Sequence, residues 1–173
     1  MLRSTWLGLF GLCVLLLRAQ SLPFADEFAP TWQRACQYTL EVAQTMPDSL
    51  YGYRPVDSVF SFGEHLLHLE GNLYGLCSRY VQGLPRRRPM PGADATDKSA
   101  VLARLRAAMA YVDSTLAATP DSALAQVATG FWSPGTRRRG IFWLMRDHMT
   151  HHRGQLIVYL RLNGLAPPRY QGW

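Results

Sequence analysis

The histidines of this chain are the residues whose spacing points most clearly to chemistry. There are five, and they lie in two short segments: His65, His68, His148, His151 and His152. In a helix, His148 and His152 would place two imidazoles one above the other on one face, the spacing with which helices present histidine pairs to zinc. Burying two such rings without partners costs on the order of 1–3 kcal/mol each. A divalent metal ion would satisfy both rings at once.

A third histidine from the other segment would complete a site with three imidazoles and one open position. That arrangement is typical of catalytic zinc sites, whereas structural sites usually close with four protein ligands. The helical wheel leaves the third ligand open, because His65 lies about 60° and His68 about 120° from the centre of the apolar stripe at 100° per residue. Periodicity alone slightly favours His65. The alternative is a set of core histidines hydrogen-bonded to Tyr, Gln or Asp side chains.

The elements that must position these histidines are helices. Four segments carry apolar residues at helical spacing, separated by breaks rich in proline and glycine, and no segment alternates like a strand. The pattern predicts helices over residues 27–46, 61–83, 97–118 and 140–163, with a helical turn within 123–129. Pro30 would fall in the first turn, where proline is tolerated. Four amphipathic helices predict an all-α fold, a four-helix bundle.

Local signals mark the ends of two of these helices. Ser61 and Glu64 are spaced as a capping box, in which each side chain bonds the backbone amide of the other residue. Gly83 and Gly164 follow the second and fourth helices, where a left-handed glycine commonly ends a helix. The loops after the second and third helices are long, so loop length does not fix the order of the helices around the bundle.

Two cysteines lie in predicted helices, and we expect them to be unbridged. If the first two helices are antiparallel neighbours, Cys36 and Cys77 are offset by roughly 13 Å along the axis, whereas a disulfide needs Cα atoms within about 7 Å. Cys77 also lies about 180° around the helix from His68, which excludes it as a ligand of the same metal.

The first 20 residues have the pattern of a secretory signal peptide. Arg3 precedes an apolar run from Thr5 to Leu17, which is too short to span a bilayer core of about 30 Å. Ala19 offers a small residue for cleavage, and Leu12 before Cys13 argues against a lipoprotein. The alternative is a buried N-terminal helix. We therefore expect a signal peptide over residues 1–20, a single domain over 21–173, and export to the periplasm or the medium.

The formal net charge of +6 does not describe the whole surface. The basic excess is concentrated in the leader and in two arginine triplets at residues 86–88 and 137–139. Both triplets fall in predicted loops without an accompanying aromatic or glycine pattern, so we expect solvated charge there rather than a nucleic-acid site. After cleavage of the leader, no membrane partner is expected either. The sequence leaves open whether the chain forms a homodimer.

Two sequence blocks resemble the DinB-like superfamily, which comprises damage-inducible, metal-binding helical bundles and is distinct from the DNA polymerase of the same name. The first block is Tyr53-Arg54-Pro55 followed by Ser61-Phe62-Gly63-Glu64-His65-Leu66-Leu67-His68-Leu69. The second runs from Asp147-His148-Met149-Thr150-His151-His152-Arg153-Gly154-Gln155-Leu156 into Tyr159-Leu160-Arg161-Leu162-Asn163-Gly164 and Pro167-Pro168. The resemblance implies a four-helix bundle whose metal ligands are His68, His148 and His152.

The resemblance also indicates which functions to expect. Some relatives are transferases or isomerases that use low-molecular-weight thiols on a metal, and many have no assigned reaction. We expect a metal-dependent transferase or hydrolase acting on an unidentified small molecule; the alternative is an exported metal-binding or ligand-binding bundle without turnover. Three imidazoles suit zinc, nickel, iron or copper. No catalytic nucleophile or base is nominated, and the candidates for supporting the ligands are His65, Asp147 and Gln155.

Overall fold

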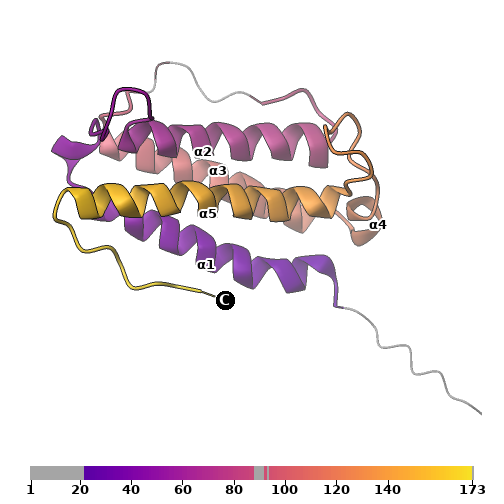
Figure 1. Ribbon diagram of the computed structural model, residues 1–173. Helices are drawn as coiled ribbons and strands as arrows, with labels where there is room; N and C mark the ends of the chain where they lie inside the picture. Colours follow the sequence, from indigo (N-terminus) through magenta and orange to yellow (C-terminus); the bar gives the residue numbers. More distant parts are fainter. Residues whose placement is uncertain (1–21, 88–91, 93, 173) are drawn as a thin grey trace, which may run out of the picture.

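The computed structural model describes residues 22–87, 92 and 94–172, and over these residues the protein is a bundle of helices (Figure 1). No strand occurs in this part of the chain; the closest feature is an isolated bridge between Val127 and Arg137. The all-α prediction is therefore confirmed. The helices are α1 (Phe24–Thr45), α2 (Phe62–Leu76), α3 (Lys98–Ala118), the short α4 (Asp121–Leu124) and α5 (Arg138–Leu162), with a 3-10 turn η1 (Asp48–Leu50) and a π-helical turn η2 (Cys77–Val81) that continues α2.

The four long helices pack in the order α1, α3, α2, α5 around the bundle. The side-by-side pairs are α1 with α3, α3 with α2, α2 with α5, and α5 with α1. Helices α1 and α2 therefore lie diagonally across the bundle, and the assumption that they are neighbours was wrong. The long loop after α2 leads into α3, which lies beside α2. Helix α2 is thus in contact with α5, the helix that carries the other three histidines.

The core is a continuous apolar cluster contributed by all four long helices. Leu69 and Leu73 of α2, Leu105 of α3 and Leu156 of α5 are among its fully or almost fully buried members. At the end of the bundle where α1 begins, Phe28 packs edge-on against Trp143, with 4.9 Å between the ring centres. Because each helix buries an apolar stripe of its own, the fold has a core that does not depend on a metal.

The helix ends follow the local signals except at α1. The capping box at Ser61 and Glu64 is formed, and Gly83 and Gly164 have positive φ angles of 71° and 72°. Helix α1, in contrast, begins at Phe24 rather than at residue 27, so Pro30 lies inside the helix and not in its first turn. The backbone amide of Phe24 donates to the carboxylate of Asp121 at 3.2 Å, a cap supplied by a segment far along the chain.

The short helical turn is shifted relative to its prediction. It spans Asp121–Leu124 rather than residues within 123–129. Pro120 stands at its N-cap position, and Leu124 is buried. The remaining predicted helices differ from α3 and α5 by only one or two residues at their ends.

Cys36 and Cys77 are free thiols, as predicted. The reason differs from the expected one, since the two helices that carry them lie diagonally across the bundle. The leader over residues 1–20 falls outside the described residues. Within the described part of the chain, no helix has the length and apolar character required to cross a membrane.

Candidate metal centre

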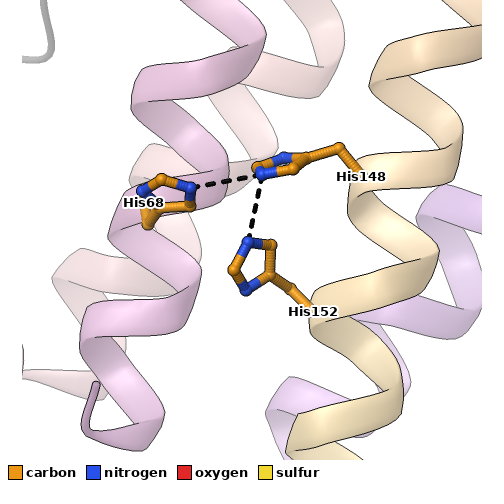
Figure 2. Close-up of side chains that lie close together, drawn as sticks. All are labelled: His68, His148 and His152. Carbon is orange, nitrogen blue, oxygen red and sulfur yellow. Dashed lines mark hydrogen bonds between the residues drawn. The ribbon is translucent and has the colours of Figure 1, made fainter. Parts of the chain in front are cut away.

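Three histidines from α2 and α5 meet at one point of the bundle (Figure 2). His68 comes from α2, and His148 and His152 come from successive turns of α5. The Nε2 atom of His148 lies 3.2 Å from Nε2 of His68 and 3.1 Å from Nε2 of His152. His152 is buried, His148 is half-buried and His68 is exposed. The cluster therefore lies at the edge of the bundle, with its open side at His68.

The spacing of these nitrogen atoms fits a metal ion. Tetrahedral zinc with Zn–N bonds of about 2.0–2.1 Å separates its ligand nitrogens by about 3.3 Å. The Nε2–Nε2 distances from His148 to His68 and His152, 3.2 and 3.1 Å, are close to that edge length, and all three ligand atoms lie within 4.8 Å of one another. Three neutral imidazoles cannot satisfy one another fully, because the Nε2 atom of His148 would need to bond two neighbours with one proton or one lone pair. The donor set therefore fits a divalent metal ion better than a closed hydrogen-bond network.

A hydrogen-bonded chain behind His152 sets the orientation and tautomer of that ring. The Tyr159 hydroxyl lies 2.9 Å from the Phe60 carbonyl, His65 Nε2 lies 3.3 Å from the hydroxyl, and His65 Nδ1 lies 2.9 Å from His152 Nδ1. A carbonyl can only accept, so Tyr159 donates to it and its oxygen accepts from His65 Nε2–H. His65 Nδ1 then accepts from His152 Nδ1–H. This polarity leaves the lone pair of His152 on Nε2, the atom that faces the other two histidines.

Burial keeps the histidines of the cluster neutral. Burial, together with the charge repulsion of neighbouring histidines, lowers the pKa of His148 to about 4 and that of His152 to about 3. Burial also lowers the pKa of His68 and brings that of His65 to about 4. A metal ligand must be deprotonated before it binds. At neutral pH the rings are therefore already in the form that a metal requires.

One buried nitrogen of the cluster lacks a hydrogen-bond partner within the described residues. It is Nδ1 of His148, which is buried. Histidine ligands of metals usually donate this second N–H to a carboxylate, a carbonyl or water. His152 has such a partner in His65, so the two ligands of α5 are not supported equally.

The three candidates for supporting the ligands are placed differently by the structure. His65 lies directly behind His152, as described. Asp147 is exposed and forms an ion pair with Arg146 at 3.2 Å. The amide of Gln155 bonds the ring of His151 at 2.8 Å, on the exposed side of α5. Asp147 and Gln155 therefore bond residues other than the three ligand histidines.

Sequence reasoning missed Tyr159 and Phe60 as parts of the site. Tyr159 lies seven residues after His152 on the same face of α5, a spacing that could have indicated contact with the same neighbour. Phe60 lies just before α2, with its ring centre 5.5 Å from that of His65 and 5.4 Å from that of His68. No periodicity applies to Phe60, because it precedes the helix.

This chain is similar to known proteins in sequence and in fold. The sequence model of the DinB family matches residues 19–172. The crystal structure of the DinB-like protein YjoA from Bacillus subtilis has a TM-score of 0.68 and 19% sequence identity, covering 84% of this chain and 97% of that one. A DinB-like protein from Bacillus cereus has a TM-score of 0.67 and 16% identity, with the same coverage. At these identities the two structures show the fold alone. Among curated proteins there is no match.

Proposed function

This chain belongs to the DinB family, and from that premise we propose that it binds one divalent metal ion through His68, His148 and His152 and leaves one position open for a small molecule. The observation that carries this proposal is the convergence of three Nε2 atoms from two helices at distances close to those of a metal's coordination edges. Zinc, nickel and iron are the metals that we expect first.

The different exposure of the three rings supports an open fourth coordination position. His152 lies inside the bundle and His68 is exposed, so a fourth ligand can approach from the His68 side without displacing the core. A metal bound there would act as a Lewis acid on that ligand or lower the pKa of a bound water or thiol. The chain itself supplies the neutral rings and, through His65 and Tyr159, the orientation of His152.

We further propose that the metal centre is the active site of a metal-dependent enzyme, either a thiol-dependent transferase or a hydrolase. A cavity with polar side chains near the open position would favour an enzyme over a plain metal binder. A groove with polar lining residues includes Asn72, one helical turn beyond His68. The alternative is an exported bundle that holds metal or ligand without turnover, which the same metal centre would also serve.

Export through a signal peptide over residues 1–20 is part of the proposal. Its support is the sequence pattern of the leader alone. N-terminal sequencing of the protein from its native host should begin near Gln20. Recovery of the soluble cytoplasmic protein with Met1 intact would contradict export and would leave the metal proposal untouched.

The metal proposal is tested by metal content and melting temperature of five single variants, each with one histidine replaced by alanine. We expect about one metal ion per chain in the unaltered protein and loss of it with His68→Ala, His148→Ala or His152→Ala. His151→Ala is the matched control, because among the described residues its ring hydrogen-bonds Gln155 alone and contacts His152 only edge-on, with 5.0 Å between ring centres. Chelation should leave the protein folded and lower the melting temperature by mass action only. Equal metal binding by all five variants would refute the ligand assignment.

A further inference from the structure

A groove on the surface of the bundle lies next to the histidine cluster and is not explained by it. The groove has a volume of about 340 Å³, within the range of small-molecule sites. It is formed by the second half of α2, by η2, by the loop that follows and by the loop before α5. The lining residues are Asn72, Gly75, Leu76, Arg79, Tyr80, Arg86 and Trp132.

The floor of the groove is on the same face of α2 as His68. At 100° per residue, Asn72, Gly75 and Arg79 all fall within about 40° of the direction of His68. They lie along the helix from His68 at rises of about 6 to 16 Å at 1.5 Å per residue. A single elongated molecule could therefore lie along α2 with one end at the histidines and the other between the arginines.

The far end of the groove is basic. The two charged residues that line it are Arg79 and Arg86, and none of the described lining residues is acidic. Arg86 lies close against α2 at Gly75, where a β-carbon would stand 2.7 Å from Arg86 Nε. Its neighbour Arg87 stacks over the ring of Tyr74 at 4.4 Å. Arg86 and Arg87 of the first triplet make these contacts and remain exposed to solvent, as expected for loop charge.

Aromatic rings flank the arginines. Trp132 is 68% exposed. It lines the groove, and its ring centre lies 3.8 Å from that of Phe131 and 6.4 Å from that of Tyr80. The Arg79 guanidinium lies 5.6 Å from the centre of the Tyr80 ring. An exposed aromatic surface beside two guanidinium groups suits a planar ring that carries an anionic group.

The end of the groove nearest the histidines has an unmet acceptor. The Oδ1 atom of Asn72 is buried and has no hydrogen-bond partner among the described residues. A buried acceptor without a donor is costly, and ligands often supply the missing group. A ligand N–H or O–H at this point would satisfy the amide, one turn away from the histidines.

We propose that this groove binds the anionic, aromatic end of a small molecule, whose other end reaches the open metal position through a segment that donates a hydrogen bond to Asn72. The inference rests on the proposed metal centre for the second end, whereas the first end depends only on the groove.

The groove is tested with phenyl phosphate as the probe, by calorimetric titration of the metal-free protein. We expect saturable one-to-one binding that is at least tenfold tighter than that of inorganic phosphate, since phosphate lacks the ring. Binding should weaken at least tenfold in Arg79→Gln combined with Arg86→Gln, and also in Trp132→Ala. Arg106→Gln, an exposed arginine of α3, is the matched control. Equal affinity in the double variant and the control, or phosphate binding as tightly as phenyl phosphate, would overturn the proposal.

The connection to the metal centre is tested with a phenyl phosphate that carries a hydroxamate on an amide-containing linker of about 10 Å. This probe should bind the metal-loaded protein at least tenfold more tightly than the metal-free protein, because two linked contacts act at once, and phenyl phosphate should show no such difference. The gain should shrink in Asn72→Leu. A gain of less than twofold in protein whose metal content is confirmed would refute the connection alone. Absence of bound metal beside intact phenyl phosphate binding would refute the proposed function instead.

Discussion

Replacing His65 tests whether the chain behind His152 sets the metal affinity of the centre. His65→Leu removes the acceptor of the hydrogen bond that His152 Nδ1–H donates. This bond is 2.9 Å long and buried in the protein. A buried donor left without an acceptor costs about 1–3 kcal/mol. His152 can avoid that cost by moving its proton to Nε2, but Nε2 is then no longer a ligand.

Either outcome weakens metal binding although all three ligand side chains are still present. Loss of a hydrogen-bond partner of a metal-bound histidine typically lowers metal affinity 10- to 100-fold, which corresponds to about 1.4–2.7 kcal/mol. Tyr159→Phe acts one step further away, on the longer contact of 3.3 Å, and should have a smaller effect in the same direction. His152→Ala removes a ligand and should have the largest effect.

The assay is competition for zinc against a chromophoric chelator, with circular dichroism to check that each variant is folded. Nitrogen NMR shifts of His152 report its tautomer independently of affinity, and they should show the Nδ1–H form in the unaltered protein and loss of that preference in His65→Leu. His151→Ala is the control on the exposed face. The reasoning fails if His65→Leu binds zinc within twofold of the unaltered protein, or if it loses as much affinity as His152→Ala.

Three further predictions concern stability and reactivity. The metal-free protein should lose stability as the pH falls from about 6.5 toward 4, because the pKa values of His65, His148 and His152 in the folded state are lowered, so the unfolded chain binds protons first; urea unfolding curves that do not change over this window would contradict it. Cys36 and Cys77 should react slowly with a thiol reagent until the protein unfolds, since burial raises the pKa of Cys77 to about 11 and that of Cys36 further; fast labelling of either thiol in the native protein would argue against their burial. Glu70→Ala should lower the unfolding free energy more than Asp147→Ala, because the Glu70 carboxylate is buried against Arg104 at 2.9 Å, whereas the Asp147 carboxylate is exposed and its loss should cost less than about 1 kcal/mol; similar values for the two variants would contradict the burial argument.

The sequence by itself determined the helices and the face that each one buries. Helical hydrogen bonds and caps are local, so periodicity and short motifs such as Ser61 with Glu64 are sufficient to place them. The pairing of His148 with His152 is of the same kind, since four residues span one turn of a single helix. The family resemblance to the two sequence blocks added the choice of His68, which periodicity alone did not make.

Only the tertiary structure decided which helices are neighbours and which side chains meet between them. The long loops permit several orders around the bundle, and the packing of whole apolar faces selects one, with α2 between α3 and α5. That order sets His65 against His152, whereas Asp147 and Gln155 bond Arg146 and His151 instead. The early start of α1 has the same origin, because its cap is the carboxylate of Asp121, 97 residues further along the chain. Contacts of this range depend on the summed packing of the core, and no local pattern in the sequence encodes them.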